Sequence, residues 1–189
     1  MAYGNQFKTD ELGGLNFSAT YTDEQYPLGT IAVQQADELG ATTIEGTVIG
    51  NSGVDTALDF ALLQGDRTWM FIKAGVAIAA GDLVAPNAYG TPFVGKPDAA
   101  DNTVTQQLLG VADNAIALNS YGWVCIRGTC VVAGTGSILL GSKLDSHGST
   151  GTAGQVTVST STDSTVIGYA LEALSGTKTN FAQAYIDVT

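Results

Sequence analysis

The stretch Leu109–Ala115, LGVADNA, decides the fold because a related stretch, IGYALEA, follows 58 residues later at Ile167–Ala173. The flanking sequence repeats in the same order. KAGVAIAAGDLV (Lys73–Val84) is echoed by VAGTGSILLGSKL (Val132–Leu144), and WVCIRG (Trp123–Gly128) by QAYIDV (Gln183–Val188). Ordered matches at a nearly constant offset indicate an internal duplication, in which each copy completes its hydrophobic core against the other.

The duplicated region consists of short Val/Ile-rich segments bounded by glycine, such as WMFIKAG (Trp69–Gly75) and TVIGYALEAL (Thr165–Leu174). Strands that recur every 8–12 residues or so, with turn signals between them, are typical of antiparallel sandwiches and barrels. No long amphipathic helical pattern separates them, which argues against a doubly wound α/β fold. We therefore predict an all-β fold: a small antiparallel β-barrel or sandwich with internal duplication, plus an extended N-terminal arm.

Three regions follow from this pattern. Residues 1–27 form the arm, residues 28–66 a β-rich acidic segment, and residues 67–189 the duplicated body, with repeats at about 67–128 and 129–189. In the acidic segment we expect strands at Leu28–Gln34 and Thr42–Gly50. Thr56–Gly65 is also interpreted as a strand, although its apolar residues fit a helical face as well.

The arm carries aromatic residues without helical or strand periodicity. Such rings can lie in grooves of a neighbouring subunit, or they can cap the arm's own domain. Two polar loops, Gly95–Thr105 and Asp145–Gly154, occupy equivalent places in the repeats and are candidate surface contacts or solvated connectors. The candidate interface residues are Tyr3, Phe7, Phe17, Tyr21, Tyr26, Asp98, Asp101 and His147.

Charge excludes one class of partner. Only 13% of residues are charged, and the net charge is −11. Phosphate binding requires clustered Lys and Arg, and the seven basic residues here are scattered, so we expect no direct nucleic-acid binding. Residues 1–66 carry a net charge of −9, which suggests either a partner with a basic face or a soluble appendage.

No stretch approaches the roughly 20 apolar residues of a membrane helix, and the N-terminus lacks the pattern of a signal peptide. We expect synthesis in the host cytoplasm and no membrane partner. Cys125 and Cys130 lie in one apolar run. In a continuous strand they are too far apart for a disulfide, whereas a hairpin at Arg127-Gly128 would bring them together; reduced core thiols are the favoured interpretation.

Catalytic patterns are missing from the sequence. His147 is the single histidine, which argues against a zinc site of ordinary spacing and against a Ser-His-Asp triad. Gly136–Lys143 (GSILLGSK) has Ser142 before Lys143, the reverse of the order in a phosphate-binding loop. Calcium at a subunit interface stays open. We expect no enzyme activity, no cofactor and no metal.

An ordered set of motifs resembles the head-decoration, or cement, proteins of tailed bacteriophages. The motifs cover roughly residues 67–189, and residues 1–66 match no pattern of that family. They are Lys73-Ala74-Gly75, Gly81-Asp82-Leu83-Val84, Gly110-Val111-Ala112 and Gly122–Gly128.

The resemblance implies a non-enzymatic β-barrel or β-tulip protein on the outer surface of the virion capsid. Its partner would be the major capsid protein, whose adjacent subunits it cements, and it would assemble as a homo-oligomer, a trimer in that family. We expect the arm to lie on the capsid or on an adjacent copy.

Two alternatives remain open. A phage tail, fibre or spike component shares the same β-rich composition. A small-ligand or glycan-binding β-module would belong to a different class. Its carrier-domain version, suggested by IKAGVAIAAGDLV, lacks the Met-Lys-Met setting of a modified lysine at Lys73.

Overall fold

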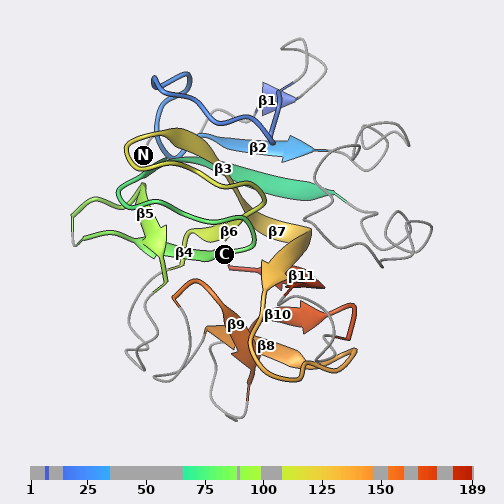
Figure 1. The fold of residues 1–189 in the computed structure, drawn as a ribbon. Helices are drawn as coiled ribbons and strands as arrows, with labels where there is room; N and C mark the ends of the chain where they lie inside the picture. The colour runs from blue at the N-terminus through green and yellow to red at the C-terminus, as the bar shows by residue number, and fades with distance from the viewer. Residues whose placement is uncertain are drawn as a thin grey trace.

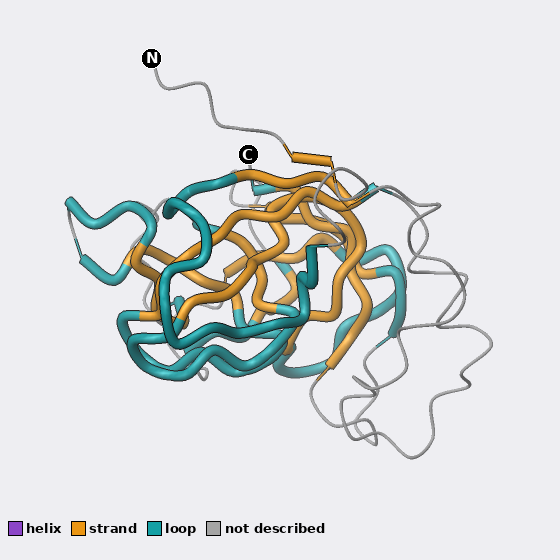
Figure 2. Tube along the Cα trace, turned by 90° about the horizontal axis from the view of Figure 1, so that it is seen from above, coloured by secondary structure: helices purple, strands orange, loops and turns teal. Residues whose placement is uncertain are grey.

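The chain is built from strands and tight turns. The computed structural model describes residues 7–8, 15–34, 66–88, 90–98, 108–146, 153–159, 166–173 and 181–188, and these contain no helix (Figure 2). The all-β prediction is confirmed. The strands, which belong to one sheet, are β1 Phe7–Lys8, β2 Ile31–Gln34, β3 Arg67–Ala74, β4 Leu83–Pro86, β5 Val94–Pro97, β6 Gly110–Ala112, β7 Tyr121–Ala133, β8 Lys143–Ser146, β9 Val156–Val158, β10 Val166–Ala170 and β11 Phe181–Asp187.

Strands β3, β5, β4, β6 and the first half of β7 form a closed ring, which we call barrel 1. The sheet order runs β3-β5-β4-β6-β7, and β7 pairs back to β3 over Thr68–Lys73. All pairings in the ring are antiparallel except β3 with β5. Closure leaves no free edge in the ring, because each of its strands pairs with a neighbour on both sides.

The second half of β7 begins another ring, barrel 2, with β11, β10, β8 and β9. A parallel bridge between Gly134 and Val156 closes it, with the Thr135 amide donating to the Val156 carbonyl at 3.0 Å. The two groups of strands lie one above the other in Figure 1, with β7 running from one into the other.

The pairings in the two barrels correspond strand by strand. β4 pairs antiparallel with both β5 and β6, and β8 pairs antiparallel with both β9 and β10. β6 pairs with β7 as β10 pairs with β11, and β3 pairs with β7 as β7 pairs with β11. The sequence duplication is thus a duplication of the barrel itself.

The glycine in each copy of the motif lets two strands approach closely. A Cβ on Gly110 would lie 2.5 Å from the carbonyl oxygen of Cys125 on β7, and a Cβ on Gly168 would overlap the carbonyl oxygen of Tyr185 on β11. Cys125 and Tyr185 hold equivalent positions, because β6 pairs with β7 in the same register as β10 pairs with β11. Any side chain at Gly110 or Gly168 would push the paired strands apart.

Barrel 1 has its own apolar interior, contributed by strands from around the ring and by the turns at one end. A second cluster runs from the outer face of barrel 1 into barrel 2 and includes Trp69, Trp123, Val132 and Leu144. The interior residues of barrel 1 are Ile72, Ala74, Ile78, Val84, Leu109, Ala112, Ile116, Val124 and Ile126.

Residues 15–30 run along the outer face of barrel 1 and pack against it. The ring of Phe17, only 7% exposed, stacks on Trp69 with centroids 5.1 Å apart and meets Trp123 edge-on at 5.2 Å. Tyr21 and Tyr26 are half-buried against Phe71. The sequence left open whether these rings pack on the arm's own domain, and the structure shows that these three do.

Beyond this segment, the strand expected at Leu28–Gln34 is present over its last four residues, as β2 Ile31–Gln34, which pairs antiparallel with β3, whereas Leu28 and Gly29 form a turn. β1 pairs parallel to β2, with Phe7 opposite Ala32. The segments Thr42–Gly50 and Thr56–Gly65 lie outside the described residues.

Replacing the motif glycines tests the close approach of the strands. Gly168→Ala and Gly110→Ala should each lower the free energy of unfolding by about 2–3 kcal/mol or more, because the new methyl group meets a backbone carbonyl that cannot rotate away. Gly136→Ala is the control: its φ is +76° with open space around it, so only the left-handed backbone costs energy, about 1–2 kcal/mol. Denaturant unfolding measures all three, and losses at positions 110 and 168 no larger than at 136 would contradict the assignment.

Residues 15–30 should be required for stability. Phe17→Ala should cost about 3–5 kcal/mol, because it empties a site between two tryptophans. Thr20→Ala, at an exposed position on the same segment, should leave the unfolding midpoint unchanged. A loss below about 1 kcal/mol for Phe17→Ala would show that the segment is dispensable for the barrel.

Candidate functional site

Three turns of the same design stand at barrel ends: Ile78–Asp82, Ile116–Ser120 and Ile138–Ser142. In each, the isoleucine is buried and the last residue donates its amide to the carbonyl three positions earlier, at 2.9–3.2 Å. The residue before the last has positive φ: Gly81 at 82°, Asn119 at 63° and Gly141 at 78°. These are the φ requirements of a type II turn, and asparagine is the residue that best substitutes for glycine there.

The turns expose apolar side chains at their outer ends. Leu140 is 70% exposed, Leu139 66%, Leu118 57%, and Val76, just before the first turn, 46%. We call these four residues the apolar tips. Val76 and Leu118 belong to neighbouring turns of barrel 1, which are joined by the Ile78–Ile116 bridge, and the two leucines at 139 and 140 belong to barrel 2. Leu118 and Leu140 hold the same position in their turns, two residues after the buried isoleucine. Exposed aliphatic residues on such turns are a candidate contact surface.

Asp82 joins the first turn to barrel 2. Its carboxylate accepts the Ala79 amide at 2.8 Å and lies against Gly154, where a Cβ would come within 2.5 Å of the carboxyl group. The Leu83 amide donates to the Gly154 carbonyl at 2.7 Å, and the Gly154 amide donates to the Asp98 carbonyl at 2.9 Å. Burial raises the pKa of Asp82, and the hydrogen bond from Ala79 offsets part of this rise.

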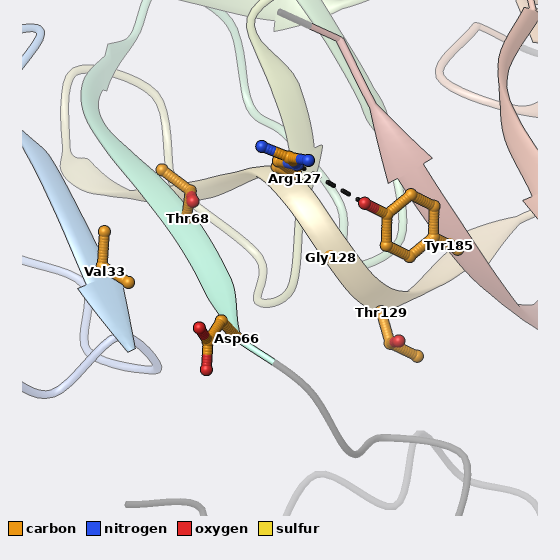
Figure 3. A pocket seen from close by; sticks show the side chains of 7 residues that line it. All are labelled: Val33, Asp66, Thr68, Arg127, Gly128, Thr129 and Tyr185. Atoms are coloured by element: carbon orange, nitrogen blue, oxygen red, sulfur yellow. Dashed lines mark hydrogen bonds between the residues drawn. The ribbon is translucent and has the colours of Figure 1, made fainter. Parts of the chain in front are cut away.

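A cleft of about 440 Å³ lies where the barrels meet (Figure 3). Arg127 and Tyr185 are its most prominent side chains: the Arg127 Nε donates to the Tyr185 hydroxyl at 3.4 Å and lies 3.7 Å from the Asp187 carboxylate. The hydrogen bond to Tyr185 and the charge of Asp187 raise the pKa of Arg127. The lining residues are Val33, Asp66, Thr68, Arg127, Gly128, Thr129 and Tyr185.

Ionisable groups gather around Cys130 near the junction: Cys125, Asp113 and Arg67 all lie close enough to influence its pKa. Cys125 and Cys130 are free thiols inside the core, both on β7. Contact with Cys125 and burial together raise the pKa of Cys130 well above its ordinary value, so it is a protonated thiol and a poor nucleophile. Burial raises the pKa of Asp113, which the nearby Arg67 partly offsets. Arg67, itself buried, lies over the Trp69 ring at 5.9 Å.

Among the residues that the structure describes, no group of three His, Cys, Asp or Glu side chains is placed to hold a metal ion. Nor does this part of the chain contain a helix long and apolar enough to cross a membrane.

The candidate interface residues fall in different places. Phe17 is buried within the chain, and Tyr21 and Tyr26 pack beside it. Asp98 is buried, and its backbone links β4 to Gly154. The backbone of Phe7 lies in β1. Tyr3, Asp101 and His147 lie outside the described residues. Among the described candidates, the structure brings Phe17, Tyr21 and Tyr26 together on the outer face of barrel 1 and places Asp98 beside Gly154.

The apolar tips were missed from the sequence. AIAAG and ILLG are short apolar runs, and such a run has the same sequence pattern whether its residues are buried in a strand or exposed on a turn. The signal that could have found them is the recurrence of isoleucine three residues before a glycine or asparagine, at Ile78, Ile116 and Ile138.

No family model matches the chain. The search of curated proteins finds no match either. Among solved structures, the chain is similar to the head fiber gp8.5 N base of bacteriophage phi29, at 20% identity and a TM-score of 0.47. The similarity covers 64% of this chain and 94% of that chain. At this identity and score, the function proposed below does not rest on it.

The raised pKa of Asp82 predicts a pH-dependent stability. Because the folded-state pKa lies above the ordinary value of 3.8, the carboxyl group favours folding while protonated, and this contribution is lost as pH rises through the folded pKa. Asp82→Asn keeps an oxygen acceptor for the Ala79 amide and removes the buried charge. Its stability relative to the wild type should therefore rise as pH increases from about 4 to 7.

Urea unfolding at a series of pH values measures this difference, with Asp23→Asn, an exposed position, as the control. A difference between Asp82→Asn and the wild type that stays constant with pH, or shrinks as pH rises, would contradict the assignment.

Proposed function

We propose that this chain is a non-enzymatic structural protein of a bacteriophage virion, which binds the outside of the capsid and holds adjacent major capsid subunits together. The observation that carries the proposal is the role of the motifs that resemble head-decoration proteins. Gly110-Val111-Ala112 is β6 itself, Gly81–Val84 makes the turn into β4, and Gly122–Gly128 is the half of β7 that closes barrel 1.

The resemblance therefore lies in residues that determine the barrel rather than in surface positions. Gly110 fixes the approach of β6 to β7, and Gly81 supplies the positive φ of the turn. A shared motif that sets backbone geometry supports a shared scaffold. It does not by itself identify the contact surface, which must come from the exposed side chains.

The apolar tips are the contact surface that we assign to the capsid. They project from turns in both barrels, so one copy can contact the shell at separated points. Each contact is small, but contacts repeated over a lattice stabilise the shell collectively, as linked binding sites do. Phe17 is therefore not assigned to the capsid, because its ring packs within the chain. Tyr3 and Phe7 remain candidates for contact between the arm and the capsid or an adjacent copy.

The chemistry of the described residues supports a structural role. The two cysteines are buried, and Cys130 is held as a protonated thiol. The arginine of the junction cleft is already paired to Tyr185 and Asp187. None of these groups forms a nucleophile–base pair of the kind that hydrolysis requires.

Binding to shells tests the proposal. Purified protein should co-sediment with tail-less heads of the source phage that lack this chain. Leu118→Asp combined with Leu140→Asp should weaken that binding about tenfold or more, because two apolar contacts are replaced by buried charges. The control carries the same added charge at exposed positions away from the turns, Thr20→Asp with Ala88→Asp, and should bind as the wild type does.

Binding to isolated tails and not to heads would instead identify a tail or fibre component. Equal binding by the two double variants would show that the apolar tips do not contact the shell.

A further inference from the structure

Two equivalent rows of side chains cross the outer faces of the barrels. In barrel 1, the register places Leu83, Val111, Cys125 and Trp69 side by side across β4, β6, β7 and β3. The same pairings in barrel 2 place Lys143, Tyr169, Tyr185 and Thr129 across β8, β10, β11 and β7. Residues opposite one another on antiparallel strands point to the same face. We call these sets outer row 1 and outer row 2.

Outer row 1 is covered within the chain. All four of its side chains are at most 1% exposed. Barrel 2 covers one end, where Leu83 hydrogen-bonds to Gly154, and Phe17 covers the other end by stacking on Trp69. Outer row 1 is thus shielded from solvent by barrel 2 and by Phe17 of the N-terminal segment.

Outer row 2 is open and has a different composition. Tyr169 is 48% exposed, Tyr185 37%, and Lys143 is exposed, while Thr129 is buried. Where barrel 1 has leucine, valine and cysteine, barrel 2 has lysine and two tyrosines. Tyrosine contributes a large apolar ring with a polar tip at low entropic cost, and it is enriched at protein interfaces. This composition suits a face that meets solvent before it meets a partner.

The tyrosines are also held in position. Tyr169 and Tyr185 are a direct cross-strand pair, and the Tyr185 hydroxyl accepts a hydrogen bond from Arg127, which pairs in turn with Asp187. A preorganised aromatic surface loses less entropy on binding than a mobile one.

We infer that outer row 2 is the docking surface for a second copy of this chain. Every copy carries the two elements that seal outer row 1, namely a barrel of the same design and the N-terminal segment across it. That segment also exposes Asp23 and Glu24, whose charge is complementary to Lys143 and Arg127. Within one copy, barrel 2 covers outer row 1; between copies, the next copy would cover outer row 2 in the same way. Such a contact joins two different surfaces, so it is head-to-tail, and it closes into a ring when the rotation between copies permits.

Sedimentation velocity of the full chain tests the interface. The wild type should self-associate, and Tyr169→Asp and Lys143→Glu should each raise the dissociation constant roughly tenfold or more. Both positions are exposed, and a thermal melt confirms that each variant folds. Ser137→Asp, at an exposed position of the same barrel outside the row and outside the apolar tips, should associate as the wild type does. A monomeric wild type, or association that persists in both row variants, would overturn the inference.

Mixing separates a head-to-tail contact from a symmetric one. A tagged Tyr169→Asp copy keeps the surface that docks on outer row 2, so it should still capture untagged wild-type protein. If the row instead paired with itself, the variant would capture none, and the head-to-tail assignment would be wrong.

The inference is independent of the capsid. A protein that self-associates through outer row 2 but fails to bind heads would refute the proposed function alone. Head binding by a protein that stays monomeric would refute the interface alone.

Discussion

Strand β7 belongs to both barrels, and the rest of the structure depends on this sharing. Its first half completes barrel 1 against β3 and β6, and its second half begins barrel 2 against β11. The change of partner occurs at Gly128, whose φ is 115° and where a Cβ would lie 2.7 Å from the Asp66 carbonyl oxygen. A residue with a side chain would separate β3 from β7 at the point where one barrel passes into the next. The two barrels are therefore joined by continuous strand rather than by a flexible linker.

The two copies keep the same backbone and differ in their surfaces. Equivalent glycines allow the close strand approaches, and equivalent turns donate the same backbone hydrogen bonds: the Gly81 amide donates to the Ala112 carbonyl as the Gly141 amide donates to the Ala170 carbonyl. At the turn, Asp82 in one copy stands where Ser142 stands in the other, and each accepts the amide three residues earlier. Conserving the backbone while changing the outer row lets barrel 1 bury its row within the molecule while barrel 2 presents lysine and tyrosine to solvent.

Much of the fold could be read from the sequence, because the duplication is marked by residues with strict backbone roles. LGVADNA and IGYALEA match at the glycine that the strand approach requires, and the second half of the strand expected at Leu28–Gln34 is present as β2. Closure into two rings could not be read, because it depends on pairings between strands distant in the chain, such as β3 with β7. The packing of Phe17 on Trp69 was equally inaccessible, since an aromatic residue on an irregular segment has no periodicity that reveals its partner. The contact surface could not be read either. Polar loops are the obvious surface candidates in a sequence, whereas the exposed apolar groups lie on turns whose sequences resemble strands.

The most direct test of the account is the copy number of this chain in purified virions, measured by quantitative mass spectrometry against the most abundant shell protein. A capsid protein that repeats with the lattice should be present in a fixed small-integer ratio to the shell subunits. It should also remain with the heads when the tails are removed. A few copies per particle, or copies that purify only with tails, would contradict the account.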